Sequence, residues 1–152
     1  MADHVRKRVR DAAKTLLSGA SIEVGPNVFT SRVDPLQDAE LPAIKLTTPE
    51  ETSTILAHGV MSGKRKVERT LMLKAEICVK QVSGYEDTAD EIAKDVEIAI
   101  AGDNTLGGLC KHIQLTGTVT ELAGEGERPI ARTTLSFEVY YITALDAPDT
   151  PD

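Results

Sequence analysis

Tryptophan is absent from this 152-residue chain, aromatic residues make up only 3%, and cysteine occurs twice. With so few aromatics, we expect a core built from aliphatic side chains. Cys78 and Cys110 lie far apart and show no zinc or disulfide-framework spacing, so we interpret them as free thiols in a reducing cytoplasm. No apolar run approaches the roughly 18–20 residues that span a bilayer. We also expect no secretory signal, because no apolar region follows the charged N-terminus.

What the chain does contain is typical of a globular domain, with 41% hydrophobic and 27% charged residues. Its length fits one domain, large enough to bury a core without disulfides or metal. The net charge of −7 predicts overall repulsion from nucleic acids and anionic membranes. We therefore expect no membrane partner and no sequence-specific nucleic-acid binding.

Two segments have the apolar spacing of amphipathic helices. The first is predicted over residues 3–18, with Asp3 as its N-cap. The second is predicted over residues 86–101. It begins with Glu86 and Asp87, whose negative charge favours the N-terminal end of the helix dipole.

Period-two alternation is clearest over residues 67–82, which predicts a long antiparallel strand with one buried face. Further extended segments are predicted at 27–33, 41–46, 113–119 and 135–141, the last two joined by a hairpin turn at 124–127. Residues 48–66 fit neither pattern and are interpreted as a long, mobile loop.

The order of these segments predicts an α+β fold, with one mainly antiparallel sheet and two helices packed on one face. We expect a single domain over residues 1–145. The acidic, proline-rich segment 146–152 is predicted to be a disordered tail.

The sequence offers no convincing catalytic, cofactor or metal site, so we expect a protein that is not an enzyme. Residues 102–109 have the glycine spacing of a phosphate-binding loop, but Gly108 and Leu109 stand where that loop needs Lys and Ser or Thr. The three histidines are scattered without ligand spacing. A cysteine nucleophile needs a lowered pKa and an orienting base. Cys78 lies on the more polar face of the predicted strand and Cys110 beside Lys111, so neither is excluded, but a structural thiol is favoured for both.

Two basic stretches stand out. Arg6, Lys7, Arg8 and Arg10 lie on the first predicted helix, where a solvated face is favoured over a nucleic-acid surface. Candidate assembly contacts lie near the end of the predicted loop: Lys64, Arg65, Lys66 and Arg69. No aromatic residues are interleaved with them for base stacking, so we weigh a contact with an acidic protein surface equally with a solvated loop.

The chain resembles the lambda-type tail terminator proteins of long-tailed phages. The resemblance rests on the order of elements and on the segment Leu41-Pro42-Ala43-Ile44, the strand 67–82, the acidic helix from Glu86 and the closing strand through Ile142. It implies a homo-oligomeric, hexameric ring that caps the tail tube, stops its polymerisation and joins it to the head. The implied partners are the tail tube protein and a head-side connector, in a virion tail assembled in the host cytoplasm. The alternative is a small ligand-binding or regulatory α+β domain.

Overall fold

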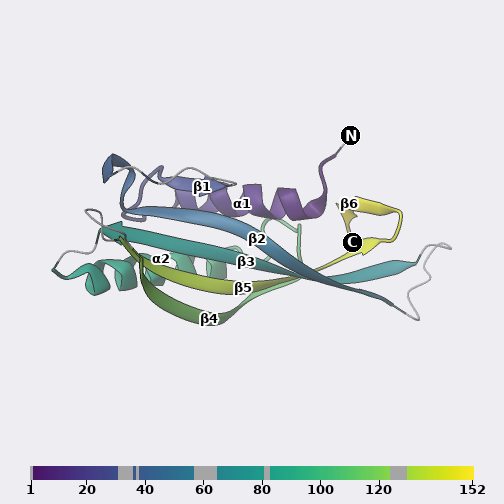
Figure 1. The fold of residues 1–152 in the computed structure, drawn as a ribbon. Coiled ribbons are helices and arrows are strands. Elements are labelled where there is room, and N and C mark those ends of the chain that lie inside the picture. The colour runs from purple at the N-terminus through teal and green to yellow at the C-terminus, as the bar shows by residue number, and fades with distance from the viewer. Residues whose placement is uncertain (1, 31–35, 37, 57–64, 81–82, 124–129) are drawn as a thin grey trace.

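The computed structural model describes residues 2–30, 36, 38–56, 65–80, 83–123 and 130–152 (Figure 1). Six strands within these ranges form one sheet in the order β1-β2-β3-β5-β4, and β6 pairs with the end of β5. The strands are β1 (Val28–Thr30), β2 (Ala43–Ile55), β3 (Lys66–Lys80), β4 (His112–Ala123), β5 (Ile130–Ala144) and β6 (Ala147–Pro151). All neighbours pair antiparallel except β1 and β2, which are parallel.

Two α-helices, α1 (Val5–Gly19) and α2 (Tyr85–Gly102), lie on the same face of this sheet, as the ribbon in Figure 1 shows. A short 3₁₀ turn, Asp38–Glu40, precedes β2. The predicted α+β fold with one mainly antiparallel sheet is therefore confirmed, and both helices occupy the positions that their apolar spacing predicted. None of the helices that the structure describes combines the length and apolarity needed to cross a membrane.

The main core lies between the sheet and the helices and is largely aliphatic. Its largest fully buried side chains include Leu17 of α1, Ile92 of α2, Leu71 and Ile77 of β3, and Leu135 of β5. On β3 the buried positions alternate through Leu71, Leu73, Ala75, Ile77 and Val79. This alternation is the pleat expected of a strand with one face against a core.

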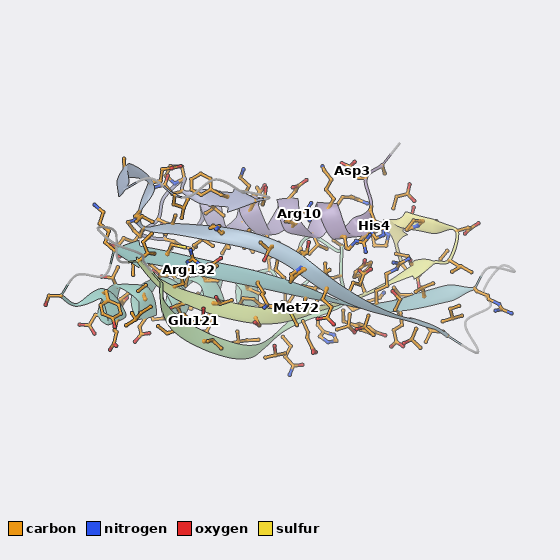
Figure 2. All side chains as sticks on the ribbon, viewed as in Figure 1. Asp3, His4, Arg10, Met72, Glu121 and Arg132 are labelled. Carbon is orange, nitrogen blue, oxygen red and sulfur yellow. The ribbon has the colours of Figure 1, made fainter. Side chains whose placement is uncertain are left out.

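Neither α1 nor α2 covers the other face of the sheet, which is mostly polar among the described residues. Met72, Glu121 and Arg132 are labelled on this face in Figure 2. A small second cluster, Leu36, Ala43 and Cys78, covers one end of it. Cys78 does sit on the more polar face, as the alternation of the strand predicted, but this cluster buries its thiol.

Three sequence-based predictions need correction. The N-cap of α1 is His4, whose Nδ1 accepts a hydrogen bond from the Arg6 backbone N–H at 3.0 Å, while Asp3 pairs with Lys7 at 2.9 Å. The segment from Thr48 to Ile55 is not a loop but the second half of β2.

The C-terminal segment is the third correction, because Ala147–Pro151 form β6 instead of a disordered tail. Backbone pairing to β5 and polar contacts with α1 and β3 stabilise a segment whose composition alone suggests disorder. Four predicted segments fall wholly or partly outside the described residues, namely 31–33, 57–64, 81–82 and 124–127.

Candidate assembly interface at the β2–β3 arm

The distal halves of β2 and β3, together with the end of β5, form an arm in which Lys66–Met72 of β3 also pair with Glu138–Ala144 of β5. Its described residues pair from Glu50 with Met72 to Ile55 with Val67. β1 pairs only with Ile44–Leu46 of β2, so along the arm no described strand pairs with the outer edge of β2, the edge away from β3. In Figure 1 the paired ends of β2 and β3 extend past the N-terminal end of α1. Two of the predicted assembly contacts, Lys66 and Arg69, lie on this arm, and Arg65 directly precedes it.

A bulge in β2 decides which side chains of the arm face the helices. Before the bulge Thr47 pairs with Lys74, and after it Glu50 pairs with Met72, so β2 contains one extra residue. Such an insertion shifts the alternation by one position. As a result the carboxylate of Glu51 is directed toward the helix-covered side of the sheet, where only 5% of its side chain is exposed.

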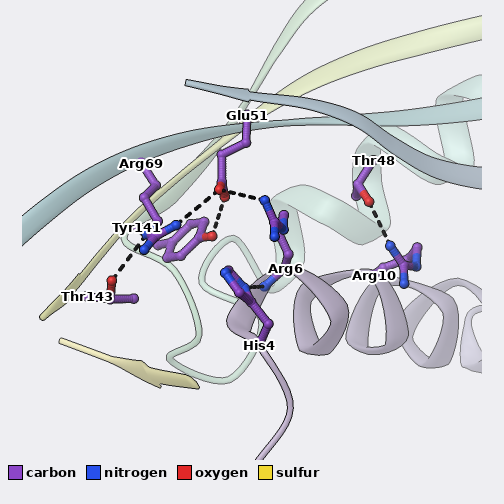
Figure 3. A network of polar contacts seen from close by, with 8 residues as sticks. All are labelled: His4, Arg6, Arg10, Thr48, Glu51, Arg69, Tyr141 and Thr143. Atoms are coloured by element: carbon purple, nitrogen blue, oxygen red, sulfur yellow. Dashed lines mark hydrogen bonds and ion pairs between the residues drawn. The ribbon is translucent and has the colours of Figure 1, made fainter. Parts of the chain in front are cut away.

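Glu51 is the centre of a polar network that joins four elements (Figure 3). Its carboxylate accepts hydrogen bonds from Arg6 at 3.1 Å, from Arg69 at 3.2 Å and from the hydroxyl of Tyr141. Arg69 also donates to the hydroxyl of Thr143 at 3.1 Å, and its guanidinium lies 6.0 Å from the Tyr141 ring centroid. The network ties the base of the arm to α1 and β5.

The titration behaviour of this region follows from burial. Burial raises the pKa of Tyr141 well above its usual value, and the hydrogen bond to Glu51 acts in the same direction. Burial also lowers the pKa of His4, with a further contribution from the charge of Arg6. Both pKa shifts favour the neutral form of the side chain, as burial generally does.

The structure separates the four candidate assembly contacts into different roles. Lys64 lies outside the described residues. Arg65 is exposed, and its backbone carbonyl accepts a hydrogen bond from Leu145 at 2.8 Å. Lys66 pairs with Asp152, and Arg69 belongs to the Glu51 network, where 12% of its side chain is exposed. Among the described candidates, Arg65 alone is exposed to solvent.

The C-terminal strand β6 packs against the far described end of the arm and contacts α1. Arg8 donates to the Asp149 carbonyl at 2.8 Å, and the Asp152 backbone N–H donates to Ile142 at 2.8 Å. A salt bridge between Lys66 of β3 and Asp152, which follows β6, joins this segment to β3 as well. Sequence reasoning missed this docking because nothing local in the segment indicates its partners.

The basic face of α1 is largely engaged within the chain. Arg6 contacts Glu51, Arg10 donates to the Thr48 hydroxyl at 2.8 Å, and Lys7 pairs with Asp3 and Asp11. These contacts favour the interpretation of a structural, partly solvated face over that of a nucleic-acid surface.

Both cysteines are buried and free. Burial raises the pKa of both thiols, Cys78 and Cys110, to about 11, which disfavours the nucleophilic thiolate near neutral pH. His112 stacks on Tyr140 with ring centroids 5.2 Å apart. Within the described residues, no three His, Cys, Asp or Glu side chains are grouped as they would be around a metal ion.

The glycine-rich segment after α2 forms a series of turns and does not follow a strand. Leu106, Gly107 and Gly108 have φ angles of 48°, 70° and 93°. The side-chain amide of Asn104 donates through Nδ2 to the Ile113 carbonyl and accepts through Oδ1 from the Ile113 backbone N–H, both at 2.9 Å. The segment therefore connects α2 to β4 and has a different context from a phosphate-binding loop, which lies between a strand and a helix.

No protein-family profile matches the sequence, and no curated protein matches it. A search of solved structures finds similarity to a chain in a structure titled "Virion of native gene transfer agent (GTA) particle". The match has a TM-score of 0.56 and 13% sequence identity, and covers 87% of this chain and 92% of that chain. At this identity the match establishes a shared fold over nearly the whole of both chains.

Proposed function

We propose that this protein is a non-catalytic structural component of a phage-like virion, and in particular a tail terminator. The observation that carries the proposal is the fold, which it shares over 87% of its length with a chain of the gene transfer agent virion at a TM-score of 0.56. The order of elements that resembles the lambda-type terminators supports the finer assignment. In this role the protein has no enzymatic activity and needs no cofactor.

The architecture of the arm is consistent with such a role. The Glu51 network fixes the arm against α1 and β5 before any partner is present. A preorganised contact surface loses less conformational entropy on assembly than a flexible one. The protein then acts as a homo-oligomeric, hexameric ring that caps the tail tube protein, stops its polymerisation and offers its other side to a head-side connector.

A ring of identical subunits needs two different, complementary patches on each copy. The described sheet has two uncovered margins of different sequence, the distal half of β2 and the outer edge of β4. Unlike margins on one chain favour head-to-tail association over a two-fold dimer. In the particle, the ring belongs to the virion tail and is assembled in the host cytoplasm.

The alternative, a small ligand-binding or regulatory domain, has less support. A cavity of about 190 Å³ lies beside Leu41, Pro42 and Tyr85. Ligand pockets usually enclose about 300–1,000 Å³. This cavity is smaller than that range. A larger one of about 360 Å³ beside Ile98 and Ile113 is lined mostly by apolar side chains and lacks the convergent polar groups of a ligand site, so neither cavity favours the alternative.

The test has two parts. Sedimentation and electron microscopy of the purified protein over a range of concentrations should reveal six-subunit rings. Deleting the gene in the particle-producing strain should give tails of uncontrolled length that fail to join heads, and the wild-type gene supplied in trans should restore both properties. A monomer at every concentration, together with normal tails in the deletion strain, would refute the proposal.

A further inference from the structure

A groove of about 360 Å³ lies between the C-terminal half of α2 and the first residues of β4. Ile98 of α2, Ile113 and Leu115 of β4, and Phe137 of β5 form its apolar wall, and Glu97 is at its rim. We call it the α2–β4 groove. Its polar lining besides Glu97 comes from Asn104, whose amide groups already bind the backbone of Ile113. The groove therefore lacks the convergent polar groups that orient a small ligand.

The surface around the α2–β4 groove has features of a protein-binding site. Ile98 is 63% exposed and follows the exposed acidic residue Glu97 on α2. The adjoining strand β4 has no described partner on its outer edge, and Glu121 is its one acidic or basic residue besides His112. Proteins usually protect an exposed edge strand with charges, proline or a covering element. An edge with so little protection next to an apolar groove favours a protein as the occupant.

The far described end of the arm carries a patch that matches this groove. Ile55 is 50% exposed and Leu145 is 51% exposed. The backbone hydrogen bond from Leu145 to Arg65 places Leu145 beside an exposed cation, and Ile55 pairs with Val67, two residues further along β3. We call Ile55, Arg65 and Leu145 the arm patch. It offers apolar side chains and a positive charge where the groove offers an apolar wall and a negative rim.

We propose that the α2–β4 groove of one copy receives the arm patch of a second copy. Ile55 and Leu145 pack against the groove wall beside Ile98, and Arg65 pairs with Glu97. The groove and the arm patch come from different parts of the chain, so each copy can engage one neighbour on each side. This inference rests on the proposed ring and names the surfaces that would build it.

Charge reversal across the contact provides the sharpest test. Glu97→Arg and Arg65→Glu each place like charges at the contact, so the concentration for half-assembly should rise at least about tenfold in sedimentation experiments. In an equimolar mixture, the introduced arginine of one variant meets the introduced glutamate of the other at one contact, and the next contact keeps the original pair. Assembly of the mixture should return to within about threefold of the wild-type protein. Such rescue would show that the charges meet between copies.

Matched controls separate the contact from general surface effects. Asp90→Arg changes an exposed acidic residue two turns earlier on α2 and is the control for Glu97→Arg. Lys14→Glu changes an exposed cation of α1 and is the control for Arg65→Glu. Neither control should change the concentration for half-assembly. Ile98→Lys should weaken assembly, while Val119→Lys, at a position 57% exposed and outside the groove lining, should not. Thermal unfolding of each variant checks that the monomer still folds.

The outcomes distinguish this contact from the proposed function. Rings that form equally well in Glu97→Arg, Arg65→Glu and wild type would overturn the contact and leave the ring in place. Charge-dependent association that stops at open chains would support the contact and overturn the ring. A wild-type protein that stays monomeric at every concentration would overturn both. Single variants that weaken assembly without rescue in the mixture would also refute the Arg65–Glu97 pairing.

Discussion

Replacing Glu51 tests whether the polar network fixes the arm. Glu51→Gln keeps the shape of the side chain and one acceptor oxygen, but it removes the charge between Arg6 and Arg69. Arg69 is 12% exposed, so its charge would be left largely buried without an anion, whereas Arg6 is 45% exposed and can be solvated. Breaking a buried pair by removing one partner typically costs about 3–5 kcal/mol, and exposed pairs contribute far less.

For Glu51→Gln we therefore expect a loss of about 3 kcal/mol in the free energy of unfolding. In a domain of this size that corresponds to a fall of about 6–12 °C in Tm. Thermal and denaturant unfolding followed by circular dichroism measure both quantities. Glu50→Gln is the matched control, because its side chain is exposed on the neighbouring position of the same strand, and it should change stability by less than about 0.5 kcal/mol.

A double substitution separates the pair from the rest of the network. Glu51→Met with Arg69→Met removes both buried charges together, so the double variant should be more stable than Glu51→Met alone. If Glu51→Gln and Glu50→Gln prove equally stable, the carboxylate does not organise the arm. The burial of Glu51 and Arg69 would then not make their ion pair important for stability.

Two further predictions concern the thiols and the C-terminal strand. Because burial raises the pKa of Cys78 and Cys110 from 9.0 to about 11, the unfolded chain loses these protons first, so stability should fall as pH rises from 9 toward 11. Replacing both cysteines with Ala should flatten this part of a pH–Tm curve, and an unchanged slope would contradict the assignment. Deleting residues 146–152 removes the contacts of β6 with Arg8 and Lys66 and should lower stability by about 1–2 kcal/mol. A truncated chain with unchanged Tm and unchanged proteolysis would show that β6 contributes little.

The sequence alone determined the elements whose cause is local. Alternating apolar residues predict β3, and the helical spacing with acidic residues at its start predicts α2, because each pattern lies within a single element. Together they were sufficient to predict the class of fold. The basic stretch at residues 64–69 was also visible in the sequence and was predicted to make assembly contacts. In the structure Lys66 and Arg69 form ion pairs within the chain.

Tertiary structure decided what depends on partners far apart in the chain. The bulge after Thr47 turns Glu51 toward the helices, where it meets Tyr141, 90 residues away. Pro49 within the strand is the one local signal of such an irregularity. The docking of β6 likewise depends on Lys66 and Asp152, which are 86 residues apart. Composition and periodicity describe a segment only through its own residues, so contacts of this range appear only when the sheet is assembled.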